Sequence, residues 1–249
     1  MNSSMLQVTG LARAFDGVRA VDGVTFNVAA GELVALIGPN GAGKTTCFNL
    51  VNGQLRPDAG TIQLEGQRIE GLPPQVIARR GVGRTFQVAA TFASMTVREN
   101  VVLSLLAHAG KHGAMLSGSA TGFDEQANAL LARVGCLELA DAHCATLAYG
   151  NAKRVELALA LAGKPRLLLM DEPTAGMAQN SRGKLMRLAS ALAKHDRIAV
   201  LFTEHDMDVV FGFADRVIVL DRGRIIAEGT PDVIRADSRV QAAYLGAEA

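Results

Sequence analysis

The sequence lacks tryptophan and contains few of the other aromatic residues on which unpaired bases stack. Its 249 residues include 2 Tyr and 9 Phe, whereas proteins that bind single-stranded nucleic acid depend on aromatic platforms. Positive charge is not in surplus either, because 25 Lys and Arg face 24 Asp and Glu. A nucleic-acid-binding protein usually has a basic surface. The composition therefore argues against a nucleic-acid partner.

Cysteine is scarce as well. Cys47, Cys136 and Cys144 include no C-x-x-C pair, so the sequence indicates neither a disulfide framework nor a zinc site. An odd number of cysteines suits a reducing compartment, and we expect all three to have structural roles.

Long apolar runs are missing, although 49% of the residues are hydrophobic. The apolar stretch 101–107 is too short to span a bilayer, which takes roughly 18 residues. Residues 1–7 lack the pattern of a secretory signal. With 20% charged residues, the chain is typical of a globular protein with a buried core. We expect it to stay in the cytoplasm and to cross no membrane.

The distribution of apolar residues predicts an α/β fold. Residues 6–15 and 18–28 flank Asp16-Gly17, a favoured hairpin pair, and predict an antiparallel sheet. Nearly continuous apolar runs are typical of fully buried strands, and they occur at 32–37, 166–170 and 197–203. Helical patterns alternate with these runs, the first over about 43–52. This alternation predicts a parallel sheet covered by helices.

The middle of the chain, about 88–163, follows a helical periodicity and shows no convincing strand. Thr96 and Glu99 have the spacing of a capping box, which places a helix start before the apolar positions of 100–107. The Gly- and Ser-rich segment 110–122 is typical of a link between helices. We therefore predict a helical insert within the α/β fold.

The strongest motif is the segment 38–46, which fits G-x-x-x-x-G-K-[ST] between a predicted buried strand and a predicted helix. Glycines let the backbone wrap around a phosphate chain, and amides at the helix start donate to it. Lys44 would place its charge on the β and γ phosphate oxygens, and Thr45 would offer its hydroxyl to Mg²⁺. We expect the whole loop to bind nucleotide: Gly38, Pro39, Asn40, Gly41, Ala42, Gly43, Lys44, Thr45 and Thr46.

A second motif follows the predicted strand 166–170, which leads into Asp171 and Glu172. In P-loop hydrolases the first such carboxylate reaches the magnesium shell, and the adjacent one polarises the attacking water. An Asp-Glu pair after a strand is common by itself, and the P-loop upstream is what favours a catalytic interpretation. The sequence therefore predicts Asp171 as a metal ligand and Glu172 as the catalytic base.

Further segments follow these motifs in a characteristic order: Gly83-Arg84-Thr85-Phe86-Gln87, Leu147-Ala148-Tyr149-Gly150-Asn151, Asp171-Glu172-Pro173-Thr174 and Thr203-Glu204-His205-Asp206. With the P-loop, they make the chain resemble the nucleotide-binding subunits of ABC transporters over essentially its whole length. The resemblance implies a single ATPase domain over residues 1–249. Its α/β core, a P-loop NTPase core of the RecA-like type (about 1–87 and 164–249), would carry an antiparallel β subdomain and an inserted α-helical subdomain (about 88–163).

The resemblance also assigns roles to single residues. Gln87 would contact Mg²⁺ and the lytic water, His205 would bind the γ-phosphate, and Glu204 would be an exposed neighbour. Phe15 would stack on adenine, with a core position at a strand end as the alternative. The signature residues would close over ATP held by the P-loop of a second subunit: Ala148, Tyr149, Gly150 and Asn151.

The chain departs from the family pattern at several positions. Ala148 stands where the signature has Ser, Tyr149 replaces a Gly, and Asn151 replaces Gln. Ala178 stands where Asp or Asn is usual, in the segment that communicates across the subunit interface. These departures predict slower or asymmetric hydrolysis rather than none, because the P-loop and the catalytic residues are intact.

Within the family, the chain is most similar to the longer ATPase of branched-chain amino-acid importers. Three features carry this similarity: the form of the signature, the segment 83–87 with its helical continuation, and the C-terminal Ala243-Tyr244-Leu245-Gly246. It implies ATP and Mg²⁺ as cofactors, a second ATPase subunit, two transmembrane permease subunits and, indirectly, a periplasmic solute-binding protein. The chain would be a peripheral subunit at the cytoplasmic face of the inner membrane.

Three alternatives stay open. An export ATPase of the lipopolysaccharide type has a similar chain. A non-hydrolysing regulatory nucleotide-binding module is favoured by the altered signature and opposed by Glu172 and His205. A soluble ABC ATPase of translation or DNA repair would carry two cassettes or a long coiled coil, and the sequence has one cassette and no sustained heptads.

Overall fold

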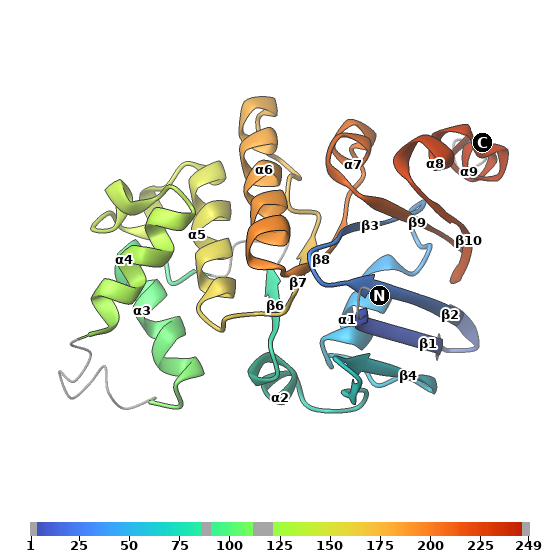
Figure 1. Ribbon diagram of the computed structural model, residues 1–249, viewed down its shortest axis with the longest axis horizontal. Coiled ribbons are helices and arrows are strands. Elements are labelled where there is room, and N and C mark those ends of the chain that lie inside the picture. Colours follow the sequence, from blue (N-terminus) through green and yellow to red (C-terminus); the bar gives the residue numbers. More distant parts are fainter. Residues whose placement is uncertain (1–3, 86–90, 112–121, 246–249) are drawn as a thin grey trace.

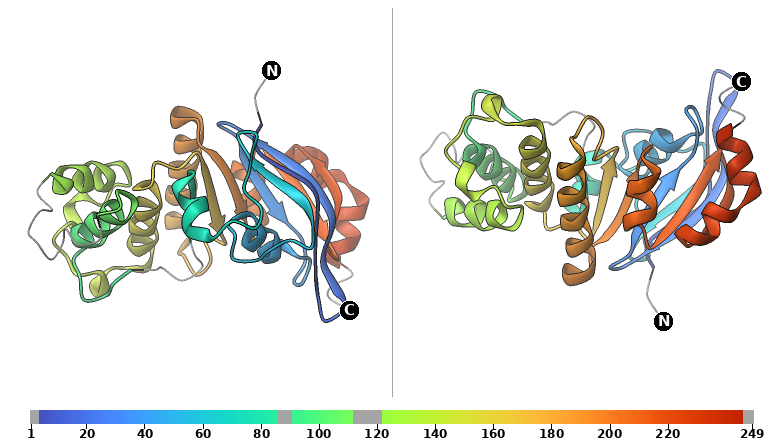
Figure 2. Two further views of the ribbon diagram at one scale, coloured as in Figure 1. Left: turned by 90° about the horizontal axis from the view of Figure 1, so that it is seen from below. Right: turned by 90° about the horizontal axis from the view of Figure 1, so that it is seen from above.

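The computed structural model describes residues 4–85, 91–111 and 122–245. Figures 1 and 2 show the helices from the middle of the chain at one end of the molecule. The larger sheet runs from the centre toward the other end, where its last strands lie beside the antiparallel sheet. No helix in these ranges combines the length and the apolar character that a membrane span requires. The overall architecture is the α/β fold that the sequence predicts.

The first sheet is antiparallel and has the strand order β2-β1-β4-β5. Its strands are β1 (Ser4–Phe15), β2 (Val18–Ala29), β4 (Ala59–Leu64) and β5 (Gln67–Arg68). The predicted hairpin is confirmed, because Phe15 pairs with Val18 across Asp16 and Gly17. Both turn residues have positive φ angles, 48° and 84°, as a tight two-residue turn between twisted strands requires.

The second sheet has the order β10-β9-β3-β8-β7-β6. Its strands are β3 (Leu33–Ile37), β6 (Val82–Thr85), β7 (Leu167–Asp171), β8 (Ala199–Thr203), β9 (Arg216–Asp221) and β10 (Arg224–Gly229). Neighbours pair in parallel, except that β10 runs antiparallel to β9 at the edge. The predicted strands 32–37, 166–170 and 197–203 are thus confirmed as β3, β7 and β8. The antiparallel edge is an addition that the sequence pattern did not predict.

Each face of the six-stranded sheet is covered by its own hydrophobic core. Along β3, Leu33, Ala35 and Ile37 face one core while Val34 and Leu36 face the other, which explains the continuous apolar run. The helices outside the insert are α1 (Lys44–Val51), α2 (Pro74–Arg79), α6 (Gln179–Asp196), α7 (Met207–Phe213), α8 (Pro231–Ala236) and α9 (Ser238–Leu245). Helix α1 fills the space between the two sheets, whereas α6 and α7 cover the opposite face. The three cysteines are buried and free, as expected of structural residues.

The middle of the chain is helical where the structure describes it. Its elements are α3 (Val97–His108), α4 (Phe123–Arg133), the short 3₁₀ helices Leu137–Leu139 and Cys144–Thr146, and α5 (Tyr149–Leu161). Over 91–111 and 122–163 the only β pairing is an isolated bridge between Thr96 and His143. The capping box is confirmed, since the Thr96 hydroxyl accepts from the Glu99 amide and the Glu99 carboxylate accepts from the Thr96 amide. Most of the predicted link 110–122 lies outside the described residues.

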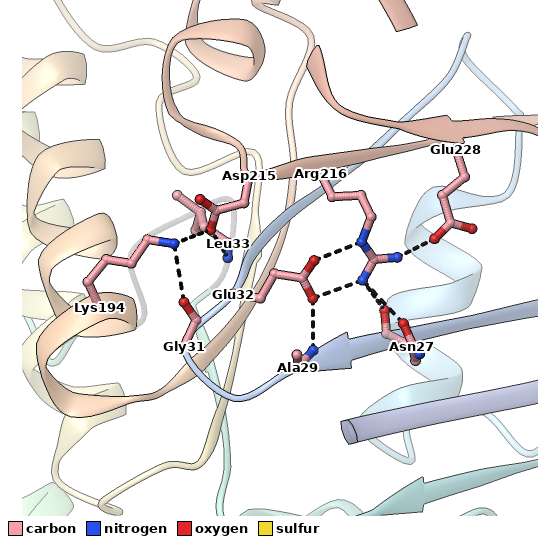
Figure 3. A network of polar contacts seen from close by, with 9 residues as sticks. All are labelled: Asn27, Ala29, Gly31, Glu32, Leu33, Lys194, Asp215, Arg216 and Glu228. Atoms are coloured by element: carbon pink, nitrogen blue, oxygen red, sulfur yellow. Dashed lines mark hydrogen bonds and ion pairs between the residues drawn. The ribbon is translucent and has the colours of Figure 1, made fainter. Parts of the chain in front are cut away.

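A network of ion pairs and hydrogen bonds connects the two sheets at the end where the parallel strands begin (Figure 3). Arg216, the first residue of β9, donates to both carboxylate oxygens of Glu32 (2.7 and 2.8 Å) and to the backbone carbonyl of Asn27 in β2 (2.8 Å). It also pairs with Glu228 of β10. Hydrogen bonding to Glu32 is the largest influence on Arg216 and raises the pKa of its guanidinium. The opposite end of the sheet, where the parallel strands finish, is where α/β proteins place their ligands.

Candidate functional site

The P-loop connects β3 to α1 at the carboxyl end of the parallel strands. The ammonium of Lys44 is buried and donates to the backbone carbonyls of Gly38 (2.6 Å) and Pro39 (3.0 Å), so the loop closes around its own lysine. Burial lowers the pKa of Lys44, while the charges of Glu172 and Asp171 act in the opposite direction. The ammonium and the two carboxylates therefore belong to one electrostatic site.

Two glycines of the loop are required by the space around them. A Cβ on Gly38 would lie 2.0 Å from the carbonyl oxygen of Leu220 in β9, and one on Gly43 would lie 2.3 Å from that of Ala20 in β2. Their φ angles, 151° and 106°, are rarely adopted by residues with a side chain. These glycines let the loop pass close to β2 and β9. The other predicted loop residues lie between them or in the first turn of α1: Asn40, Gly41, Ala42, Thr45 and Thr46.

One hydroxyl group contacts both residues that carry the predicted carboxylates. Asp171 ends β7, Thr203 ends β8, and the two residues pair across the strands. The Thr203 hydroxyl donates to Asp171 Oδ1 (2.8 Å) and accepts from the Glu172 amide (3.0 Å). Glu172 has a φ angle of 45°, which is uncommon for a residue with a side chain, and this bond helps to hold it there. Sequence reasoning gave Thr203 no such role, because the contact depends on the register of two strands.

The predicted base and the predicted phosphate ligand contact each other directly. His205 Nε2 lies 2.9 Å from Glu172 Oε1, across the gap between β7 and the loop that joins β8 to α7. The His205 side chain is 46% exposed and that of Glu172 is 23% exposed, so both are accessible to water. A base oriented by a second hydrogen-bonding side chain is the arrangement that hydrolytic enzymes use.

Glu204 corrects the expectation of an exposed residue. It is 3% exposed, and its carboxylate accepts hydrogen bonds from the backbone amide (2.8 Å) and the hydroxyl (2.6 Å) of Thr174. A carboxylate can be buried here because it satisfies two buried donors of the turn that follows Glu172. Glu204 therefore supports the turn that carries the predicted base.

The predictions for Phe15 and Gln87 stand differently against the structure. Phe15 ends β1, and its side chain is 40% exposed, so the alternative of a core position is wrong. The guanidinium carbon of Arg13 lies 4.9 Å from the centroid of the Phe15 ring, and such a cation stabilises the exposed ring. Gln87 lies outside the described residues, two positions after Thr85, the last residue of β6.

The signature residues lie at the start of α5. Ala148 is the residue that precedes the helix, Gly150 faces α6, and Tyr149 is 43% exposed. The side-chain oxygen of Asn151 accepts a hydrogen bond from Arg154 (2.7 Å). Helix α5 is separated from α1, and thus from the P-loop, by α6 and β7 (Figure 1). The structure therefore does not bring the signature to the P-loop of the same chain.

Two departures from the family pattern fall at equivalent structural positions. Ala148 is the N-cap of α5 and Ala178 is the N-cap of α6, and neither has a side-chain capping bond. Ser, Asp or Asn at such a position accepts a hydrogen bond from an amide of the first turn. The two alanines leave these amides to other acceptors.

A groove of about 480 Å³ opens between the helical insert and the rest of the protein. Its walls come from α2, β6, α3 and α5, and most of the residues that line it are apolar, among them Ile77, Val82, Phe92, Leu103 and Leu159. Arg84 and Glu156 add one charge of each sign. The groove therefore adjoins β6, whose end leads toward Gln87.

Comparison with known proteins agrees with this geometry. The family model described as ABC transporter matches residues 21–175, and a model described as branched-chain amino acid ATP-binding cassette transporter matches residues 224–249. The chain is 40% identical to LivG of Escherichia coli K12, a high-affinity branched-chain amino acid transport ATP-binding protein, over 99% of both chains. It is 36% identical to LptB of the same strain, a lipopolysaccharide export system ATP-binding protein, over 97% of both.

The fold has a solved counterpart. The crystal structure of the ADP conformation of MJ1267, an ATP-binding cassette of an ABC transporter, matches with a TM-score of 0.85 and 29% sequence identity, over 98% of this chain and 99% of that one. The family matches cover the P-loop, the Asp171-Glu172 motif and the C-terminal segment. The chain therefore belongs to the ABC transporter family, as an ATP-binding and ATP-hydrolysing cassette of the branched-chain amino acid type.

Proposed function

We propose that the chain is the motor subunit of an ABC importer for branched-chain or other amino acids, in which ATP-driven closure of two ATPase subunits moves two permease subunits. The observation that carries this proposal is the contact between Glu172 and His205 beside a P-loop that encloses Lys44. A module that only bound nucleotide would not need a carboxylate oriented by an imidazole next to the phosphate site. This contact also opposes the non-hydrolysing alternative.

Mg²⁺ would be held by Asp171, the Thr45 hydroxyl and Gln87. The described residues contain no group of three or more His, Cys, Asp or Glu side chains that could hold a metal by themselves. Mg²⁺ fits so sparse a ligand set, because it keeps several waters and binds through one or two carboxylates and substrate phosphates. When bound, the ion would neutralise negative charge on the phosphates.

The residues of the chain divide the work of hydrolysis. Glu172 takes a proton from the attacking water, and His205 holds the Glu172 carboxylate in the orientation that this transfer needs. Lys44 exchanges the two loop carbonyls for oxygens of the β and γ phosphates. Thr203 keeps Asp171 and Glu172 from turning away, and Phe15 offers its exposed ring to the adenine.

A second ATPase subunit would complete the site, because the signature of this chain lies apart from its own P-loop. The start of α5 would present backbone amides and the positive end of a helix dipole to the γ-phosphate in the partner. Since Ala148 and Ala178 provide no capping side chain, we propose a heterodimer in which a second ATPase of different sequence supplies a complete signature to one site.

The groove would receive a cytoplasmic helix of a permease subunit, which would place the chain at the cytoplasmic face of the inner membrane as a peripheral protein. We propose that residues 88–163 act as one subdomain against a core of residues 1–87 and 164–249. Import, with a periplasmic solute-binding protein supplying the cargo, is supported over lipopolysaccharide export by the higher identity to LivG than to LptB. The match of residues 224–249 supports the same choice.

ATP hydrolysis by the purified chain, alone and mixed with its second ATPase, tests the proposed base. Glu172→Gln removes the base and keeps the shape, so we expect turnover to fall by at least about 10²-fold while ATP stays bound and closed dimers accumulate. Lys44→Ala is expected to lose ATP binding. The control is Glu138→Gln at an exposed position, which should hydrolyse ATP like the parent. Hydrolysis by Glu172→Gln at the parent rate would refute Glu172 as the base.

A transport assay tests the cargo. The chain is reconstituted with its permease subunits and solute-binding protein in vesicles, and ATP-dependent movement of labelled leucine is measured. Uptake in the import direction that Glu172→Gln stops is the expected result. Movement of lipopolysaccharide without amino-acid uptake would favour the export alternative.

A further inference from the structure

Arg84 lies in β6 and connects three structural elements through one guanidinium group. Its Nη1 atom donates to the side-chain oxygens of Asn49 in α1 (2.8 Å) and of Gln54 in the turn after α1 (2.8 Å). Its Nη2 atom donates to Asp171 Oδ2 (3.1 Å). The residue that would carry the metal therefore has an arginine as a direct partner.

The Arg84–Asp171 ion pair is buried and follows from strand register. Only 10% of the Arg84 side chain and 13% of the Asp171 side chain are exposed. Burial lowers the pKa of Arg84, and the charge of Asp171 raises it. Arg84 pairs with Leu169 across the parallel strands β6 and β7, so Asp171 is the next residue of β7 on the same face. The pairing of the two strands thus brings the two charges together.

This pair competes with the proposed role of Asp171. One oxygen of its carboxylate already accepts from Thr203 and the other from Arg84. A cation beside a carboxylate opposes the approach of a second cation, and the effect is strong where water is excluded. Mg²⁺ and the Arg84 guanidinium therefore compete for the same negative charge.

Arg84 and Gln54 also line the groove between the helical insert and the rest of the protein. Gln54 is exposed, so a molecule in the groove could reach it. The bond from Arg84 to Gln54 pulls the guanidinium toward the groove, whereas the bond to Asp171 pulls it toward the phosphate site. A single side chain thus extends from the groove wall to the carboxylate that the metal needs.

We propose that Arg84 is a positioning residue that restrains Asp171 and so sets the Mg²⁺ concentration at which ATP binds. Gln54 weakens this restraint by holding the guanidinium on the groove side, and an occupant of the groove that displaces Gln54 strengthens it. The proposal rests on the proposed function of Asp171 as a ligand of Mg²⁺. Under this proposal, the Arg84 side chain connects the groove to the proposed metal site directly.

The test measures binding rather than turnover. The full chain is mixed with a fluorescent, non-hydrolysable ATP analogue, and Mg²⁺ is added stepwise. The Mg²⁺ concentration at which binding of the analogue is half-maximal is recorded for each variant. Arg84→Met removes the competing charge, so this concentration should fall roughly tenfold, the effect of losing one charge-assisted hydrogen bond. Arg84→Lys keeps a charge and should lie between Arg84→Met and the parent. The exposed Arg79→Met is the matched control and should follow the parent curve.

A second variant distinguishes this role from a structural one. Gln54→Ala removes the acceptor on the groove side and keeps the acceptors Asn49 and Asp171. The guanidinium is then held less toward the groove, so the half-saturating Mg²⁺ concentration should rise. Thermal unfolding shows whether each variant is folded. If Arg84→Met does not fold, Gln54→Ala still tests the proposal. An Arg84→Met or Gln54→Ala curve equal to that of the parent, or a higher Mg²⁺ requirement in Arg84→Met, overturns the proposal and leaves the ATPase function intact. A parent chain that binds no analogue with Mg²⁺ overturns both.

Discussion

Glu204 is adjacent to His205 in the sequence, but its carboxylate turns inward and accepts two hydrogen bonds from Thr174. Glu204→Ala would leave a buried amide and a buried hydroxyl without this acceptor. We expect the free energy of unfolding to fall by about 1 to 3 kcal/mol, as measured by urea denaturation. ATP turnover should also fall, because Thr174 lies two residues after Glu172, the proposed base.

Glu138→Ala provides the comparison for that measurement, since Glu138 is exposed in a short 3₁₀ helix. Surface substitutions away from special features change stability by less than about 0.5 kcal/mol. If Glu204→Ala were no less stable than Glu138→Ala, the two hydrogen bonds to Thr174 would not support the turn. At the scale of single residues, the buried Glu204 carboxylate is thus expected to affect both stability and turnover.

At the starts of α5 and α6, a single substitution can change the stability of a whole helix. Ala148 has the extended backbone of an N-cap and no capping side chain, so Ala148→Ser can supply the missing acceptor without moving the helix. We expect Ala148→Ser to stabilise the chain by about 1 kcal/mol, measured as a higher urea midpoint with an unchanged slope. Ala152→Ser, inside the same helix, serves as the control and should not stabilise. An unchanged midpoint in Ala148→Ser would show that other acceptors already satisfy the first turn.

Elements with a strong local pattern could be predicted from the sequence, and contacts set by strand order could not. The hairpin around Asp16-Gly17, the buried strand β3 and the capping box of Thr96 and Glu99 each depend on neighbouring residues. The bond between Arg84 and Asp171 joins positions 87 residues apart, and it arises from the pairing of β6 with β7. By contrast, the antiparallel edge strand β10 is a local feature that the prediction missed, because it follows β9 directly through the two-residue turn Arg222-Gly223. The sequence motifs therefore identified the P-loop and the predicted base, but not the residues that hold or restrain the carboxylates.

One set of contacts between the two sheets lies at the end of the larger sheet opposite to the P-loop. The ends at which the parallel strands begin are fastened to the antiparallel sheet through Arg216 and Glu32 (Figure 3). The opposite ends carry the P-loop, Asp171 and Thr203. The central strands β3, β7 and β8, which run between these ends, are buried on both faces, and among the described residues the two ends share no side-chain contact that an ion pair at one end would disturb at the other. A change at the anchor should therefore alter the stability of the fold without altering the nucleotide site.

Arg216→Met tests this separation. The substitution leaves Glu32 without its guanidinium partner, and both side chains are only 19% exposed, so we expect a loss of about 2 to 3 kcal/mol in the free energy of unfolding. Arg224→Met is the control, because Arg224 lies in β10 and pairs with Asp22 while its side chain is 69% exposed. That surface pair should contribute much less, because water screens it. Urea denaturation compares the two variants.

The same two variants are then titrated with an ATP analogue in buffer without urea, in which both are folded. Distant sites without shared partners contribute independently, so the affinity of Arg216→Met for the analogue should stay within about twofold of the parent. A loss of ATP binding in the folded Arg216→Met chain would mean that the sheet transmits strain from the anchor to the P-loop. A loss of stability with unchanged binding would establish that the ion pairs at one end of the sheet hold the fold together, while the residues at the other end are left to the nucleotide.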